Sequence, residues 1–155
     1  MTVHLRPLSG PPLVDFLVGS ADGYVSSQVA TGETEPVARR NAERALLAAF
    51  PGNRPAGGHA LFEVVDEAGT AVGHLWVGPD GASDDATWSV WDLAIAPEHR
   101  GHGHGRAAMH LAEDYVRARG GRRLTLHVFG TNTVARALYE SLGFEVTQSR
   151  MAKRL

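Results

Sequence analysis

The sequence predicts an α/β fold with a central, mostly antiparallel sheet flanked by helices, and two observations support this prediction. Short apolar stretches separated by polar turns over residues 60–96 are typical of neighbouring antiparallel strands. A strand, a glycine-rich loop, a helix and a further strand then follow over residues 88–129. A strand–helix–strand unit joins parallel strands through a right-handed crossover, so we expect one parallel pair in the mixed sheet.

The N-terminal half is expected to contain a first strand, two helices and a β-hairpin. Pro7 ends the first strand, and apolar residues at helical spacing mark the two helices. A turn at 66–69 joins the hairpin strands, and a polar loop at 78–85 follows them. The expected ranges of the strand, the helices and the hairpin strands are 3–6, 13–28, 35–50, 60–65 and 71–77.

The C-terminal half is expected to alternate strands with helices. Gly120, Gly121 and Gly143 are placed to end the two helices. The expected ranges, beginning and ending with a strand, are 88–96, 106–119, 123–129, 133–142 and 144–154. Ligands of such sheets bind where the carboxyl end of a strand leads into the next helix, so residues 95–106 are the first place to look for a site.

Length and composition indicate one globular domain, which we expect to span residues 1–155. The chain has 155 residues, of which 43% are hydrophobic and 21% charged. No apolar run approaches the ~20 residues of a membrane span, and the first residues lack the pattern of a signal peptide. There is no cysteine for disulfides, thiolate metal sites or a thiol nucleophile. We therefore expect a cytoplasmic protein with no membrane partner.

Charge is distributed unevenly along the chain. The net charge of −2 predicts no extended surface for nucleic acid. Residues 100–123 nevertheless hold six arginines against two acidic residues, and the rest of the chain is acidic. A compact basic segment suits one small anion rather than a long polyanion. The alternative is a solvated helix face with arginines at the C-terminal end of the helix dipole.

A loop with three alternating glycines joins the expected strand at 88–96 to the next helix. Its residues are Arg100, Gly101, His102, Gly103, His104 and Gly105. Such glycines let the backbone approach a ligand, and the following helix directs free N–H groups and its positive dipole end to the same place. Arg106 adds a positive charge. We expect the loop to bind a pyrophosphate; the alternative is a tight loop with no ligand.

Two other phosphate-binding patterns fit the sequence less well. A P-loop needs a lysine, and the sole lysine is Lys153, far from the loop. The dinucleotide-binding pattern is met in letters by Gly103, Gly105 and Ala108. The acid expected ~20 residues later is absent, and about a hundred residues precede the loop. A dinucleotide-binding protein therefore remains a secondary interpretation.

Two segments resemble the GNAT superfamily of N-acetyltransferases. Residues 93–105, LAIAPEHRGHGHG, resemble its acetyl-CoA-binding segment, whose loop has the form Q/R-x-x-G-x-G/A, and residues 132–144, NTVARALYESLGF, resemble its second hallmark segment. The resemblance covers residues 91–144. It implies a GNAT-like sheet whose two parallel strands splay, with pantetheine taking up the missing strand pairing. It also implies direct transfer of an acetyl group from acetyl-CoA to an amine in a ternary complex.

The resemblance assigns roles to individual residues. The backbone of Leu93, Ala94 and Ile95 would bind pantetheine and the thioester, and a backbone N–H at the strand kink would stabilise the developing oxyanion. The glycine loop would hold the pyrophosphate, with Asn132 and Tyr139 near the sulfur. The implied cofactor-binding residues are Leu93, Ala94, Ile95, Arg100, Gly101, His102, Gly103, His104, Gly105, Arg106, Asn132 and Tyr139.

The reaction needs a base and an acid. An alkyl amine of pKa ~10.4 is mostly protonated at pH 7 and must lose a proton. His127 is the first candidate base, because strand alternation places it on the face opposite Leu124 and Leu126. Some members of the family that the chain resembles carry a glutamate base at this position. The alternative is a histidine whose hydrogen bonds are satisfied within the sheet. Asp92, beside the kink, is the second, acting through water. Tyr139 matches the family's acid, which protonates the departing thiolate.

Four histidines between residues 99 and 110 lack a cysteine or acid at ligand spacing, so we expect no metal. The three tryptophans, Trp76, Trp88 and Trp91, are expected in packing rather than as a substrate platform.

The alternative function is a non-catalytic acyl-CoA-binding module. The presence of a candidate acid and a candidate base argues against it, because binding alone needs neither. The expected acceptor is a small-molecule or peptide amine, and the acidic remainder of the chain favours a cationic one. A homodimer is left open.

Overall fold

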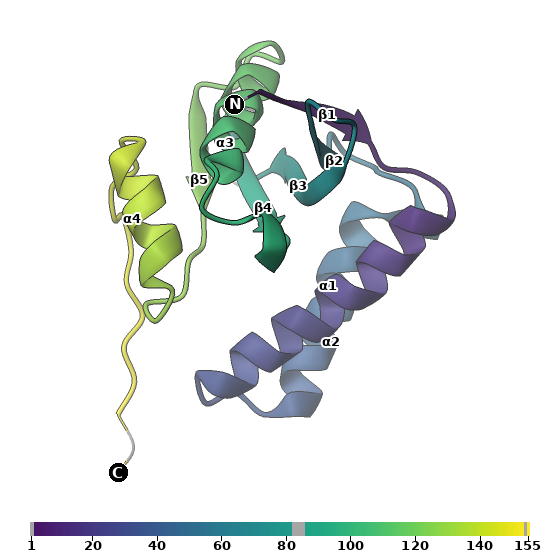
Figure 1. Ribbon diagram of the computed structural model, residues 1–155. Helices are drawn as coiled ribbons and strands as arrows, with labels where there is room; N and C mark the ends of the chain where they lie inside the picture. The colour runs from purple at the N-terminus through teal and green to yellow at the C-terminus, as the bar shows by residue number, and fades with distance from the viewer. Residues whose placement is uncertain (1, 82–85, 154) are drawn as a thin grey trace.

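Five strands form one sheet in the order β1-β2-β3-β4-β5 (Figure 1). The computed structural model describes residues 2–81, 86–153 and 155. β1 to β4 pair antiparallel in succession, and β4 pairs parallel to β5. The strands are β1 (Val3–Pro7), β2 (Ala60–Asp66), β3 (Ala71–Pro79), β4 (Thr87–Ile95) and β5 (Arg123–Leu126). The predicted mostly antiparallel sheet with one parallel pair is confirmed.

Helices cover both faces of this sheet. They are α1 (Pro11–Ala30), α2 (Glu35–Ala49), α3 (His104–Arg117) and α4 (Thr133–Ser141), with short 3-10 turns η1 (Pro51–Asn53) and η2 (Pro97–His99). Prolines at the first positions of α1 and α2 suit helix starts, where the missing N–H costs nothing. In Figure 1, α1 and α2 lie side by side, and α4 lies beyond β5. No helix in the described part of the chain is long and apolar enough to cross a membrane.

The two faces of the sheet have separate hydrophobic cores. On one face, α3 packs Ala108, Met109 and Ala112 against strand residues that include Leu75 and Val90. On the other, α1 and α2 pack on a smaller cluster whose strand residues are Leu61 and Trp76. Successive strand residues point to opposite faces, so the alternation in β2 and β3 supplies both cores. This arrangement leaves the C-terminal half of β4 between α1 on one face and α3 on the other.

An irregularity in β4 ends its pairing with β5. Asp92 lies opposite Trp76, whereas Val90 lies opposite the next residue of β3, so Trp91 is an extra residue in the ladder. Such a β-bulge bends the strand that carries it. The parallel pairing with β5 covers only Thr87 to Val90 of β4. Beyond the bulge, no described strand pairs with the far edge of β4, which agrees with the expected splay.

The strand expected at 144–154 is wrong. Residues 144–153 have no regular secondary structure, and the segment runs away from the body of the protein (Figure 1); residue 154 lies outside the described residues. Gly143, at φ +88°, ends α4, and the Phe144 N–H donates to the Tyr139 carbonyl at 3.0 Å. An extended segment becomes a strand only where its backbone groups pair with a neighbour, and no backbone hydrogen bond is made by residues 145–153 within the described chain.

Several boundaries differ from those expected, and two of them alter the site. The strand expected at 123–129 ends at Leu126, because the bulge turns β4 away from the partner it would need. The helix expected at 106–119 begins at His104, so two residues of the glycine loop lie in the first turn of α3. The turn at 66–69 is confirmed: the Asp66 side chain accepts hydrogen bonds from the backbone of Ala68 and Thr70. Part of the expected loop at 78–85, residues 82–85, lies outside the described residues.

Candidate active site

The glycine loop has an open, left-handed backbone. Gly101 and Gly103 have φ values of +79° and +82°, a region that side chains with a Cβ rarely occupy. Apart from the glycine itself and its chain neighbours, no described residue has an atom within 4 Å of the place where a Cβ would stand at either position, so the space in front of both is open. Gly103 is also the N-cap of α3, where no side chain accepts from the first N–H groups. These N–H groups can therefore bind an anion at the positive end of the helix.

A hollow of about 290 Å³ lies beside this loop, between His99, His102 and His104 on one side and the β2–β3 turn on the other. His104 is 7% exposed, and its Nδ1 has no hydrogen-bond partner among the described residues. Leaving a buried polar nitrogen unsatisfied is costly, so this atom fits a site that is completed by a ligand. The turn contributes Asp66 and Glu67, whose carboxylates disfavour an anion there and leave the glycine side for phosphate.

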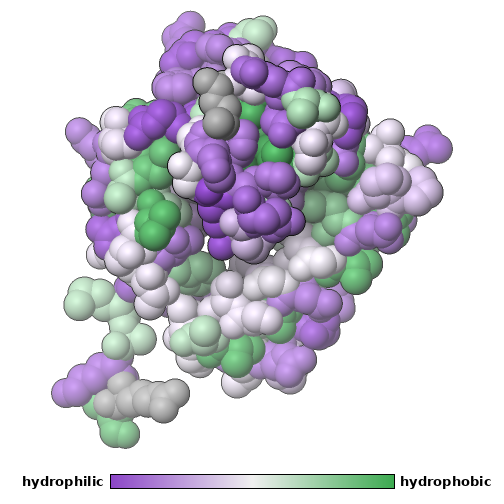
Figure 2. All heavy atoms as spheres, in the orientation of Figure 1, coloured by the Kyte–Doolittle hydropathy of each residue, from purple (hydrophilic) through white to green (hydrophobic). Residues whose placement is uncertain are grey.

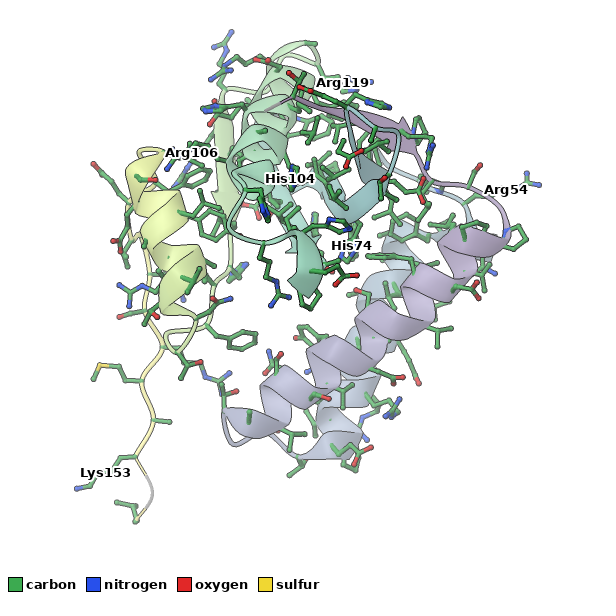
Figure 3. All side chains as sticks on the ribbon, viewed as in Figure 1. Arg54, His74, His104, Arg106, Arg119 and Lys153 are labelled. Atoms are coloured by element: carbon green, nitrogen blue, oxygen red, sulfur yellow. The ribbon has the colours of Figure 1, made fainter. Side chains whose placement is uncertain are left out.

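The two arginines of the loop tie neighbouring elements together. Arg100 Nε donates to the Ile95 carbonyl at 2.8 Å, which links the loop to the end of β4. An Arg106 guanidinium nitrogen donates to Ser141 Oγ at 2.6 Å, which links α3 to α4 (Figure 3). His102 is exposed, and its Nδ1 lies 3.4 Å from the His99 carbonyl. Both arginine charges lie beside the loop but are already engaged within the protein.

The residues expected near the thioester occupy β4 and α4. Leu93, Ala94 and Ile95 are half-buried and follow the bulge on the unpaired edge of β4. Asn132 is exposed and caps α4, where its Oδ1 accepts from the Ala135 N–H at 3.2 Å. A structural cap is thus the contact that the structure gives Asn132. Its expected contact with the cofactor stays a prediction.

Tyr139 combines burial with a neighbouring negative charge. Its ring lies edge-on to Phe144 at a centroid distance of 5.9 Å and packs against the larger core. Burial raises the pKa of the Tyr139 phenol, and the charge of Asp92 raises it further. The phenol is therefore protonated across the neutral range. A protonated phenol is the form that can donate to a thiolate.

Asp92 is part of a small polar cluster that the sequence analysis did not find. Its Oδ2 lies 3.2 Å from His74 Nε2 on β3 and 3.5 Å from Ser20 Oγ on α1. The ring of Phe16, also on α1, meets the His74 ring edge-on at 4.4 Å. The available signal was a lone polar side chain in the apolar stretch VGHLWVG. Its meaning depends on the hairpin register, which sets His74 and Asp92 diagonally on one face.

His127 does not reach this cluster. It follows the last residue of β5 and is exposed. The expectation that His127 lies in a strand lining the cleft is therefore wrong. No hydrogen bond or ring contact joins His127 to Asp92 or Tyr139 in the part of the chain that is described. Of the three expected catalytic residues, the structure relates Asp92 to Tyr139, because the charge of Asp92 helps to raise the pKa of the phenol, and leaves His127 apart.

Aromatic rings form a wall next to Asp92. Trp91 stacks on Trp76 at 5.6 Å with an interplanar angle of 23°, and its Nε1 donates to the Pro79 carbonyl at 3.2 Å. Trp76 Nε1 in turn donates to Nδ1 of His59, whose pKa is lowered by burial, as a neutral acceptor requires. The expected role in packing fits Trp76 and Trp88, which are 5% and 8% exposed. Trp91 differs, because it is 43% exposed at the bulge.

The sequence model of the acetyltransferase (GNAT) family matches residues 26–144. The chain belongs to this family. It is 27% identical over 156 residues to the N-acetyltransferase YycN of Bacillus subtilis (strain 168), with all of both chains covered. The crystal structure of YycN superposes with a TM-score of 0.88 over 99% of each chain at 26% identity. This GNAT acetyltransferase is thus an enzyme by family, as the resemblance implied.

Two further relatives show how far the similarity extends. YdgE of the same B. subtilis strain is also named an N-acetyltransferase and is 27% identical, with 100% of this chain and 99% of YdgE covered. The mycothiol acetyltransferase of Beutenbergia cavernae is 40% identical over 79 residues, which are 51% of this chain and 26% of that protein. Among the described residues, no three histidine or acidic side chains gather as a metal site.

Proposed function

We propose that this acetyltransferase transfers an acetyl group from acetyl-CoA directly to an amine while both substrates are bound. The observation that carries the proposal is the bulge at Trp91, because it opens one edge of β4 between the glycine loop and Tyr139. Acetyl-CoA supplies an acetyl group activated as a thioester. The chain supplies N–H groups at the start of α3 for the pyrophosphate and the free edge at residues 93–95 for pantetheine.

Tyr139 would hold the proton that the departing sulfur needs. The attacking amine nitrogen bonds to the acetyl carbon while the carbon–sulfur bond breaks, and the phenolic proton moves to sulfur. The raised pKa of Tyr139 keeps that proton in place until a thiolate forms. The amine must also lose a proton, and His127 and Asp92 were the candidates from the sequence. The position of Asp92 at the bulge favours Asp92 over His127.

The acceptor would lie on the side of the sheet that faces α1. The surface is hollowed between the hydrophilic loop after β4 and the paler surface of α1 (Figure 2). Asp92 and the exposed face of Trp91 border the bulge on this side, and a carboxylate beside an indole favours a cationic ligand. The acceptor is therefore an amine that reaches the site in its charged form.

A cytoplasmic location and a homodimer stay predictions.

Two measurements test this proposal. Titration calorimetry with CoA and with NADP separates acetyl-CoA use from dinucleotide binding: we expect CoA to bind, and binding of NADP alone would contradict the proposal. Release of free thiol from acetyl-CoA is then followed with a panel of polyamines, amino sugars and peptide amines, with product masses recorded. CoA binding without acetylation of any amine would instead favour the non-catalytic acyl-CoA-binding module.

A further inference from the structure

We propose that His74 takes the proton from the acceptor amine and that Asp92 holds the His74 ring in place for this step. The inference rests on the proposed acetyl transfer to an amine and names a residue outside the two family-like segments. His74 lies on β3, and Figure 3 labels it close to the end of β4. Its contacts, its accessibility and its charge environment each bear on the assignment.

The contacts of His74 determine which of its nitrogens is free. Nε2 lies 3.2 Å from Asp92 Oδ2. An ionised carboxylate can only accept, so Nε2 carries the hydrogen and Nδ1 has the free lone pair. No described residue makes a hydrogen bond to Nδ1. The edge-on ring of Phe16 restricts rotation of the imidazole, and Ser20 donates to the same carboxylate oxygen. The ring is therefore held with one basic nitrogen unused.

The pair is packed, yet it is accessible. The side chains of His74 and Asp92 are 28% and 34% exposed, so a ligand can reach them. Asp92 is the first residue after the bulge, directly before the segment expected to bind the thioester. Its charge also reaches Tyr139, whose pKa it raises. The carboxylate that contacts His74 is thus also near enough to Tyr139 for its charge to act on the phenol.

The charged groups nearest His74 lie on the neighbouring strands. Asp92 on β4 contacts the ring directly. On β2, Glu63 lies opposite His74 in the register, and its carboxylate is paired with Arg6 of β1 at 2.7 Å. The contacts from α1 with His74 and Asp92 are made by the uncharged Phe16 and Ser20. The net neighbouring charge is therefore negative and is concentrated at Asp92.

His74 suits the step better than either base expected from the sequence. An imidazole is in general a stronger base than a carboxylate and accepts a proton from an amine more readily. Asp92 is also already engaged as an acceptor from Ser20 and His74. His127 has no such partner among the described residues to orient its ring. In the balanced step, the charged amine gives one proton to His74 Nδ1, its nitrogen bonds to the acetyl carbon as the carbon–sulfur bond breaks, and the Tyr139 proton moves to sulfur. The acetylated nitrogen loses its second proton to solvent, which also takes the proton from His74 and restores that of Tyr139.

The test compares the pH dependence of kcat/KM in four variants, H74Q, D92N, H127Q and H110Q, with an amine that the wild-type protein acetylates. H74Q keeps a nitrogen at the position of Nε2 to donate to Asp92 but removes the basic Nδ1. We expect kcat/KM to fall about 10²-fold and its acid limb to disappear, with CoA affinity unchanged. D92N should cause a smaller loss and displace the limb toward lower pH. H110Q makes the same substitution at an exposed histidine of α3 and should change neither quantity.

Several outcomes would overturn the assignment. If H74Q retains the acid limb while D92N abolishes it, Asp92 is the base itself. If H127Q alone abolishes the acid limb, His127 is the base. In both cases acetyl transfer stands and the role of His74 fails. If the wild-type protein acetylates no amine, the proposed function fails and the role of His74 fails with it. Nitrogen-15 NMR of the wild-type protein needs no variant to fold: we expect the neutral His74 ring to carry its hydrogen on Nε2, and hydrogen on Nδ1 would contradict the proposal.

Discussion

The two halves of β4 belong to one strand of nine residues but differ in strand pairing and in burial. Trp88 to Val90 pair with β3 on one edge and β5 on the other, Thr87 pairs with β5, and all four residues are buried. Asp92 to Ile95 pair with β3 alone and are half-buried. The extra residue at Trp91 separates the halves. The comparison shows how one inserted residue turns a central strand into a free edge. Backbone groups of the half that loses its strand partner then become available to a ligand.

The largest effect should come from truncating matched tryptophans on either side of this division. Trp88→Ala removes an 8%-exposed ring from the paired half and should lower the free energy of unfolding by about 3–5 kcal/mol. Trp91→Ala removes a 43%-exposed ring at the bulge and should cost about half as much, while raising the KM of the acceptor. Urea unfolding and steady-state kinetics measure the two effects. Equal losses of stability would contradict the division.

Tyr139→Phe tests the acid at the open half. The change keeps the ring against Phe144 and removes only the hydroxyl, so kcat should fall about 10²-fold while the Kd for CoA stays within about twofold. Tyr115→Phe is the control, because Tyr115 of α3 contacts Phe62 of β2 and the Arg119 guanidinium rather than the free edge of β4. A Tyr139→Phe enzyme with a wild-type rate would refute the role as acid.

Gly103→Val tests the loop that follows the open half. The substitution forces a branched side chain to φ +82° and fills the space in front of the helix start, so CoA affinity should fall at least about tenfold. Gly120→Val imposes a similar backbone strain at φ +80° after α3, far along the chain from the loop. Both variants should lose about 1–2 kcal/mol of stability. Calorimetry with CoA should distinguish them, and an equal loss of affinity would remove the loop from the site.

The smallest effect concerns His59, which supports the aromatic wall at the bulge. Burial lowers the pKa of His59 in the folded protein below that of the unfolded chain. The unfolded state therefore binds a proton first on acidification, and stability should fall as the pH drops below about 6.5. His59→Asn should flatten this part of the stability profile, measured by urea unfolding between pH 7 and 5. An unchanged slope would mean that His59 is not the group responsible.

The strand directions and the segments with readable local chemistry were predicted, whereas features that depend on the exact register and length of strand pairing were not. The glycine loop and Tyr139 lie in contiguous segments whose chemistry is readable residue by residue. The pair of His74 and Asp92 arises only from the β3–β4 register, and the bulge shifts that register by one residue. The misplacement of His127 has the same origin, since β5 ends where β4 turns away. Alternation cannot reveal whether a strand partner exists, which also explains the wrong strand at 144–154.

Amide hydrogen exchange, resolved by residue with NMR, tests the division of β4 most directly. Amides of Trp88 to Val90 should exchange slowly with or without CoA, because both edges of that segment are paired. Amides in residues 92–95 and at the start of α3 should gain protection when CoA is added. Unchanged exchange at 92–95 under saturating CoA, or protection confined to the arginines at 117–123, would contradict a site built on the free edge of β4.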